Sequence, residues 1–232
     1  MPQPFRLPSN WPTTPAAAQA LQAQLAAQVR TLDDLPVIQR VAGVDVGFVD
    51  NNRVARAAIA VLRYPDLQLC DQSLAYQPVD FPYIPGLLSF REIPVILAAL
   101  NQLAQLPDLL LCDGQGIAHP RRCGIACHLG LLTNIPAIGV AKSRLVGHHA
   151  PVPDQRGAWQ PLLDQGEVIG AALRTRPGTN LLYVSPGHRI SLPTSIAYVL
   201  QCTRHYRLPE TTRLAHKLAS QRPPDPAQCK LL

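Results

Sequence analysis

The residues best suited to chemistry follow a short apolar run in the middle of the chain. Asp113 comes directly after the apolar residues 109–112 and directly before Gly114. A run this short is typical of a buried strand, and an acid at its end lies at the sheet edge where α/β proteins place their sites. The next basic residues, all able to attract phosphate, are His119, Arg121 and Arg122. An aspartate that only caps a turn fits the same pattern equally well.

A second carboxylate, Asp45, stands inside the β-branched stretch 37–48, with apolar neighbours on both sides. Burying an ionised carboxylate is costly unless a cation or hydrogen bonds compensate. Asp45 is therefore a candidate metal ligand. The alternative is a hydrogen-bonded structural aspartate at a bulge beside Gly43 or Gly47.

A third carboxylate, Glu92, lies at the mouth of a helix predicted over 93–105. Ser89 and Glu92 match the spacing of a capping box, which gives Glu92 a structural alternative. Pro94 weakens that alternative, because a regular helix that began earlier would have to run through the proline.

Two basic groups complete the set of candidates. Lys142 ends an apolar run that begins at residue 135, as Asp113 ends its own run, although solvated lysines are common at strand ends. His216 lies in the predicted last helix, on the face opposite the ridge of Leu214 and Leu218, where a histidine is usually just solvated.

Three neighbouring acids would repel one another unless a cation lay between them. Oxygen ligands with open positions suit Mg²⁺, for which Mn²⁺ substitutes, and both ions bind phosphate. Lys142, His119 and Arg121 could then orient that phosphate. The reaction class that this set favours is metal-assisted phosphodiester hydrolysis.

The elements that must position these groups alternate between strands and helices. An Asn51-Asn52 turn and short connections predict an antiparallel meander, and the later alternation predicts a mixed sheet with helices on its faces. Residues 146–167 read as loop, and strands at 168–175 and 180–184 could pair as a ribbon at one edge. The expected strands are 37–48, 54–63, 67–77, 109–112 and 135–144, and the expected helices are 16–30, 93–105, 123–133, 193–203 and 209–220.

Composition favours one cytoplasmic domain with a polyanionic partner. With 47% hydrophobic and 16% charged residues and no linker, residues 1–232 are expected to form a single, monomeric domain, with an N-terminal helical extension over 1–30 and a mobile tail over 222–232. No apolar run approaches a membrane span, and no signal-peptide core is present. The net charge of +6 favours a polyanionic partner. The six cysteines match no zinc template, and reduced thiols fit the cytosol.

An aromatic ring stands in a stiff loop between the meander and the next helix. Pro82 and Pro85 bracket Tyr83, and Gly86 closes the turn. Flanking prolines restrict the backbone and hold the ring at a fixed point. The alternative is a packed loop residue with no role in binding.

Six blocks together resemble the endonuclease V family, and they run in the family's order from about residue 37 to 220. They are VAGVDVGF (41–48), FPYIPGLLSFRE (81–92), DGQGIAHPR (113–121), GVAKSR (139–144), VSPGH (184–188) and PETTRLAH (209–216). The resemblance implies a ribonuclease-H-like fold and a DNA repair endonuclease for deoxyinosine. Such enzymes nick the strand at the second phosphodiester 3′ of hypoxanthine and leave 3′-hydroxyl and 5′-phosphate ends.

The resemblance also implies roles for individual residues. Asp45, Glu92 and Asp113 would be the metal-binding acids, His216 their fourth polar partner, and Lys142 the contact to the phosphate beside the cut. Pro82, Tyr83, Ile84 and Pro85 would form a wedge that enters the duplex. The pocket for the extruded base would be lined by Gly86, Leu88, Gly114 and Leu145. The expected partner is inosine-containing DNA, which the short chain favours, or RNA on the same fold.

Two other classes of protein remain as alternatives. A catalytically silent nucleic-acid-binding module would keep the basic surface and lose an acid, yet all three acids are present. A resolvase or transposase-like nuclease would share the acids but would not need a Tyr83 wedge. Inosine-dependent cleavage separates all three classes.

Overall fold

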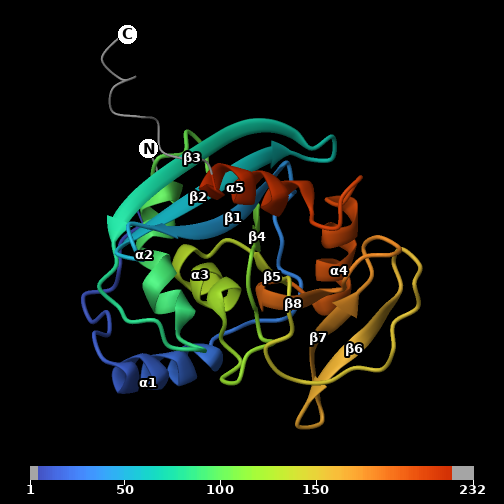
Figure 1. The fold of residues 1–232 in the computed structure, drawn as a ribbon, viewed down its shortest axis with the longest axis horizontal. Helices are drawn as coiled ribbons and strands as arrows, with labels where there is room; N and C mark the ends of the chain where they lie inside the picture. Colours follow the sequence, from blue (N-terminus) through green and yellow to red (C-terminus); the bar gives the residue numbers. More distant parts are fainter. Residues whose placement is uncertain (1–4, 221–232) are drawn as a thin grey trace.

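An eight-stranded mixed β-sheet forms the centre of the computed structural model, which describes residues 5–220 (Figure 1). Across the sheet the strands lie in the order β3-β2-β1-β4-β5-β8-β7-β6. Their bounds are β1 Arg40–Val49, β2 Val54–Arg63, β3 Gln68–Pro78, β4 Leu109–Cys112, β5 Ala137–Ala141, β6 Trp159–Asp164, β7 Glu167–Leu173 and β8 Leu182–His188.

The two halves of the sheet are built differently. Strands β1, β2 and β3 form the predicted antiparallel meander, and Asn51 and Asn52 have positive φ at its first turn. Parallel pairing joins β1 to β4 and β4 to β5, whereas β5-β8, β8-β7 and β7-β6 are antiparallel. The carboxyl ends of β1, β4 and β5 therefore meet at one edge in the middle of the sheet.

Helices cover both faces, as predicted. On one face α2 and α3 pack over a core that includes Ala42 and Val44, and on the other α4 and α5 pack over a core that includes Val41 (Figure 1). The side chains of a strand alternate between faces, so one strand supplies both cores. The helices are α1 Pro15–Ala26, α2 Leu88–Leu100, α3 Ile125–Thr133, α4 Leu192–Gln201 and α5 Glu210–Ser220.

The predicted start of the second helix was wrong. Helix α2 begins at Leu88, its N-cap is Leu87, and it contains Pro94. Most of its side chains are buried, and that burial offsets the backbone hydrogen bond lost at the proline. Ser89 does not cap the helix; its hydroxyl lies 3.1 Å from His128 Nδ1.

The ridge expected on the last helix was also wrong. The buried residues of α5 are Thr211, Thr212, Ala215 and Ala219, whereas Leu214 and Leu218 are only partly buried. Small side chains let this helix approach the sheet closely, and they give His216 a different setting from the one expected.

Three further differences concern the ends of the chain and the far side of the sheet. Residues 159–164 form strand β6 in a segment expected to be loop, and β8 lies inside the sheet beside β5 instead of at its edge. Helix α1 ends at Ala26, and the predicted tail at 222–232 lies outside the described residues. Over residues 5–220, no helix combines the length and apolar character needed to cross a membrane.

Candidate active site

The parallel pairing of β1 with β4 brings the two strand acids together. Val44 pairs with Cys112, and the backbone N–H of Asp113 donates to the carbonyl of Val44 at 2.9 Å. Asp45 and Asp113 therefore occupy the next positions of neighbouring strands. Neighbouring strands lie about 4.8 Å apart, so the two carboxylates can share one ion.

Two glycines let α5 bring His216 to the same point. A Cβ on Gly43 would lie 2.1 Å from the backbone of Thr211, and one on Gly47 would lie 3.1 Å from the carbonyl of Ala219. Gly43, Asp45 and Gly47 are every second residue of β1 and therefore lie on the same face of the strand, so α5 crosses directly over Asp45. β1 pairs with β2 without a register shift, which overturns the bulge alternative for Asp45.

The His216 ring meets the acid directly. His216 Nδ1 lies 2.8 Å from Asp45 Oδ2, and its side chain is 52% exposed, which leaves the ring open to solvent. Ligand atoms of Asp45, Asp113 and His216 all lie within 4.8 Å of one another. This cluster contradicts the bland interpretation of His216 as a solvated histidine.

Glu92 approaches the same edge from α2, on the other side of the sheet. Its side chain is buried, and burial together with Asp45 and Asp113 raises the pKa of Glu92 well above its usual range. A buried carboxylate beside two others calls for a compensating cation. We call Asp45, Glu92, Asp113 and His216 the acid cluster.

The chemistry of the acid cluster fits a hard divalent cation. Two carboxylates and an imidazole within 4.8 Å offer mostly oxygen ligands and leave positions for water or phosphate. Octahedral Mg²⁺ holds its ligands at about 2.1 Å, so their atoms lie up to about 4.2 Å apart, and small side-chain rotations would close this set around it.

Lys142 joins the acid cluster to the end of β5. Its ammonium pairs with the carboxylate of Asp113, and its side chain is 36% exposed. Burial raises the pKa of Asp113, the Lys142 ammonium opposes that effect, and the nearby Asp45 adds to it. Lys142 is thus a partner of the acid cluster and not a solvated strand-end lysine.

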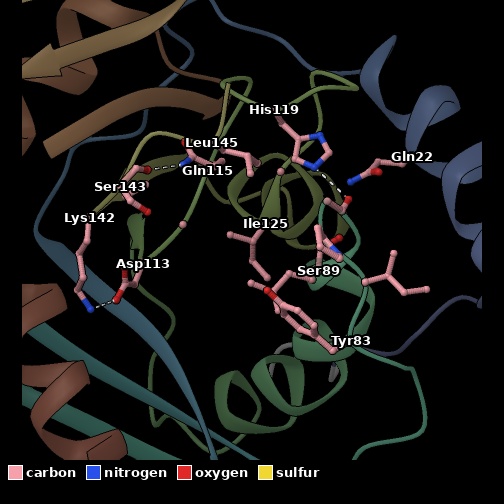
Figure 2. A pocket seen from close by; sticks show the side chains of 17 residues that line it. Gln22, Tyr83, Ser89, Asp113, Gln115, His119, Ile125, Lys142, Ser143 and Leu145 are labelled. Atoms are coloured by element: carbon pink, nitrogen blue, oxygen red, sulfur yellow. Dashed lines mark hydrogen bonds and ion pairs between the residues drawn. The ribbon is translucent and has the colours of Figure 1, made fainter. Parts of the chain in front are cut away.

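A pocket of about 410 Å³ opens beside the acid cluster, and Asp113 and Lys142 form part of its wall. Figure 2 shows Tyr83 on one side of this pocket and Asp113 with Lys142 on the other. The predicted substrate-binding residues that line it from the loop and α2 are Tyr83, Ile84, Pro85, Gly86 and Leu88. From the other wall come Gly114, His119 and Leu145, whereas Pro82 lies outside the lining.

The loop that carries Tyr83 is exposed at its tip and anchored at both ends. Tyr83 is 70% exposed, which contradicts the alternative that it is a packed residue. Phe81 and Leu87, on either side of the tip, are buried together with Phe90. The mouth of the pocket thus presents three apolar side chains to solvent, those of Tyr83, Leu88 and Leu145.

Three buried or half-buried side chains hold the inner end of this loop. The carbonyl of Gly86 accepts from Arg121 Nη2 at 2.7 Å and from His119 Nε2 at 3.0 Å. Gln22 of α1 accepts from Arg121 Nε at 2.5 Å and donates to the carbonyl of Cys123 at 2.6 Å. We call Gln22, His119 and Arg121 the Gly86 brace. Gly86 itself has φ +79°, which favours glycine.

The Gly86 brace corrects the expectation that His119 and Arg121 orient phosphate. His119 Nδ1 accepts from the backbone N–H of Arg121 at 3.1 Å, so Nε2 carries the proton that goes to Gly86. Burial, with Arg121 nearby, lowers the pKa of His119 to about 4. The ring is therefore neutral near pH 7. Arg122 is likewise engaged, with Asp164 and Glu167.

Several residues that line the pocket were not predicted to do so from the sequence. Gln22 lies in the segment expected to be a structural helix, yet it is 1% exposed and lines the pocket. A glutamine on the buried face of a helix was the available clue, since buried polar groups need partners. The other lining residues that were not expected are Ser89, Gln115, Gly124, Ile125, Ala141 and Ser143.

Comparison with known proteins identifies the family to which the chain belongs. The family model described as Endonuclease V matches residues 23–217. The chain belongs to the endonuclease V family. A relative named Endonuclease V from Trichormus variabilis is 60% identical over 216 residues, which cover 93% of this chain and 98% of that protein.

Solved structures agree with the family and the fold. Endonuclease V from Streptomyces avermitilis is 44% identical with a TM-score of 0.87, and the match covers 93% of this chain and 95% of that protein. Endonuclease V from Ciona intestinalis, in complex with a 23mer DNA containing an inosine followed by a ribo-adenosine, is 29% identical with a TM-score of 0.78, over 88% of this chain and 94% of its own. The fold is ribonuclease-H-like, as the motifs implied, and the family is one of nucleases.

Proposed function

We propose that this chain is a metal-dependent DNA repair endonuclease, a phosphodiester hydrolase, that nicks the strand at the second phosphodiester bond 3′ of deoxyinosine. The products would carry a 3′-hydroxyl and a 5′-phosphate. The observation that carries the proposal is the double position of Asp113, which belongs both to the acid cluster and to the wall of the pocket. A base held in the pocket would therefore leave its own strand beside the acids.

The pocket suits an extruded base. Exposed apolar groups at its mouth can receive the faces of a flipped purine, and Tyr83 can fill the gap left in the duplex. Hypoxanthine forms weaker pairs than the normal bases, so its extrusion costs less free energy. Gly86 and Gly114 line the pocket without side chains of their own.

Asp45 and Asp113, with Glu92 and His216, would hold Mg²⁺, or Mn²⁺ in its place. When bound, such an ion lowers the pKa of water and neutralises charge on the phosphate. Lys142, at the pocket wall, would contact the non-bridging oxygens of the phosphate beside the cut. His216, the fourth polar member of the set, would complete it from α5, with its ring half exposed to solvent.

The proposal includes the cellular location of the enzyme, its oligomeric state and its partner. The five cysteines within residues 5–220 are all free thiols, which suits the reducing cytoplasm, where we place this enzyme as a monomer. The net charge of +6 suits a polyanionic partner.

A second candidate activity is cleavage of inosine-containing RNA on the same site. The observation that favours it is the ribo-adenosine after the inosine in the strand bound to the Ciona intestinalis relative. A ribose 2′-hydroxyl is the group by which such a site would distinguish the two nucleic acids.

One experiment tests the proposal. End-labelled strands with a single deoxyinosine, single-stranded and in duplex, are incubated with Mg²⁺ or with EDTA, beside matched adenine strands and RNA strands with inosine. We expect Mg²⁺-dependent cuts only in inosine strands, one nucleotide beyond the inosine on its 3′ side. Equal cutting of adenine strands would indicate a resolvase-like nuclease, and binding without cutting would indicate a silent binding module.

A further inference from the structure

A second hollow, of about 400 Å³, begins on the far side of Lys142 from the base pocket. We call it the Arg144 groove and define it by Lys142, Ser143, Arg144, Arg174, Asn180 and Tyr183. Lys142 and Ser143 line both the groove and the base pocket, so they form the wall between them. The carbonyl of Ser143 accepts from Gln115 Nε2 at 3.0 Å, which fixes this wall.

The groove is positively charged beyond its ion pairs. Lys142 is paired with Asp113, and Arg174 with Asp154 at 3.1 Å. The exposed guanidinium of Arg144, in contrast, has no hydrogen bond or ion pair with any of residues 5–220.

A second guanidinium stands behind the groove. Arg207 donates from Nη2 to the carbonyls of Lys142 and Leu181 at 2.9 and 3.0 Å, and none of its hydrogen bonds goes to a carboxylate among the described residues. Among residues 5–220, Arg144 thus has no counter-ion, and Arg207 adds a positive charge that is near enough to Asp113 to be attracted by it but forms no ion pair.

An aromatic ring and an amide accompany these charges. Tyr183 pairs with Ala141, the residue before Lys142, in the β5-β8 ladder, and its half-buried ring packs beside His149. Asn180 is exposed and comes two residues before strand β8 begins. A basic channel combined with an aromatic face is the arrangement that proteins use for single-stranded nucleic acid, with phosphates on the cations and a base on the ring.

We infer that the Arg144 groove binds the single strand on the 3′ side of the scissile phosphate, with Arg144 on a phosphate and Tyr183 beneath a base. The inference rests on the proposed function. Tyr83 lies on one side of the base pocket, and Asp113 with Lys142 lies on the other (Figure 2). The Arg144 groove follows beyond Lys142. If the inosine fills the pocket and the cut lies 3′ of it, the strand passes the acid cluster and continues into the groove.

The test measures binding in EDTA, where no cleavage occurs. Fluorescence anisotropy compares wild type with Arg144→Ala, and with Arg6→Ala as control, because Arg6 is also exposed but lies near Asn101 at the end of α2. Three inosine strands are used: one extended on both sides of the inosine, one ending at the scissile phosphate on the 3′ side, and one shortened on the 5′ side.

We expect Arg144→Ala to weaken binding of the extended and the 5′-shortened strands about three- to tenfold near 0.1 M salt. The slope of log affinity against log salt should fall by about 0.7 for these strands, the value for one phosphate contact on a single strand. The 3′-shortened strand should bind wild type and variant equally, and Arg6→Ala should change none of the three. Arg144→Lys, which keeps the charge, should restore most of the slope.

Two results would overturn the inference: an equal loss for the 3′-shortened strand, or a loss that disappears only with 5′ shortening. An unchanged affinity of Arg144→Ala for every strand would overturn it as well. Failure of the proposed function is a separate outcome, because wild type would then bind the extended inosine strand no better than its adenine twin.

Discussion

The acid cluster and the Gly86 brace lie on opposite sides of one pocket and use polar side chains in opposite ways. In the acid cluster, three carboxylates crowd together, and burial raises the pKa of Glu92 and of Asp113. In the brace, Arg121 Nη2 and a neutral His119 donate to one carbonyl, and Gln22 accepts from Arg121 Nε. The acid cluster needs a cation from outside the chain to offset its crowded carboxylates, whereas the residues of the brace hydrogen-bond one another and Gly86.

This difference predicts different effects of substitutions on activity and on stability. Removing one of several repelling carboxylates relieves the fold, whereas removing one member of a satisfied buried network leaves its partners without hydrogen bonds. Variants of the acid cluster should therefore lose activity and keep their stability. Variants of the brace should lose some of both. The predictions below test this contrast, beginning with the largest effect on cleavage.

Asp113→Ala should reduce cleavage of an inosine strand by at least about a thousandfold, because the variant loses a metal ligand. Affinity for the uncut strand should stay within a few-fold of wild type, since the substitution also removes a negative charge near the phosphates. The melting temperature in EDTA should not fall. Single-turnover cleavage, anisotropy and a thermal melt provide the three readouts.

The matched control for that variant is Asp66→Ala. Asp66 is an exposed carboxylate that pairs with Arg63 in the β2-β3 connection, away from the residues that line the pocket. Its removal should leave cleavage unchanged. If Asp113→Ala cut inosine strands within a few-fold of wild type, the acid cluster would not be the catalytic site.

Tyr83→Ala tests the side of the pocket opposite the acids. We expect about a tenfold loss of cleavage on duplex inosine substrates and a much smaller loss on single strands, where no stacked bases need to be separated. A ring that is 70% exposed contributes little to the fold, so the free energy of unfolding should stay within about 0.5 kcal/mol of wild type and the melting temperature should change little. Tyr76→Ala, another exposed tyrosine, is the control. Equal losses on both substrates with a lower melting temperature would make Tyr83 structural.

Gln22→Leu removes the acceptor that holds Arg121 Nε and the donor to Cys123. Leaving such buried groups unpaired costs about 1–3 kcal/mol, which corresponds to a fall of roughly 2–12 °C in melting temperature for a chain of this size. Because Gly86 would be held less firmly, KM for inosine strands should rise several-fold while kcat changes little.

Two further variants distinguish positioning from simple packing. Gln22→Glu keeps an acceptor for Arg121 and should recover most of the affinity, which a purely structural role would not require. Gln19→Leu, on the exposed face of the same helix, should behave as wild type. A Gln22→Leu protein with a lower melting temperature and unchanged KM would show that the brace does not position the loop.

The sequence allowed much of the acid cluster to be predicted but little of the brace. Asp113 and Lys142 end apolar runs, and Asp45 interrupts one, so their chemistry conflicted with their neighbours and was visible locally. The contacts of the brace join residues about 35 and 99 positions apart, and no local pattern encodes them.

The errors in the fold have related causes. Pro94 and the small residues of α5 follow long-range packing that outweighs local preference, and β6 is a mostly half-buried strand at the sheet edge, with a weak alternation signal. The alternation of Gly43, Asp45 and Gly47 did contain the missing information, because two glycines on one strand face make room for a crossing helix.

The last prediction concerns stability in EDTA and not cleavage: the acid cluster and the brace should show opposite pH dependences. Burial raises the pKa of Glu92 well above its usual range, so above about pH 4.5 the folded chain keeps a proton that the unfolded chain has released. Stability therefore falls as pH rises from the unfolded pKa near 4.5. Glu92→Gln should raise the melting temperature at pH 7.5 by a few degrees, and the gain should shrink as pH falls toward about 4.5.

His119 in the brace should show the reverse. Burial lowers its pKa to about 4 from 6.5, so below pH 6.5 the unfolded chain takes up a proton that the folded chain binds only near pH 4. Stability is thus complete above pH 6.5 and falls by roughly 2 kcal/mol on going to pH 5. In His119→Gln the melting temperature should be lower at pH 7.5 but should fall less between pH 7 and pH 5 than in wild type. If both variants shifted the pH dependence in the same direction, the contrast between a strained acid cluster and a satisfied brace would be wrong.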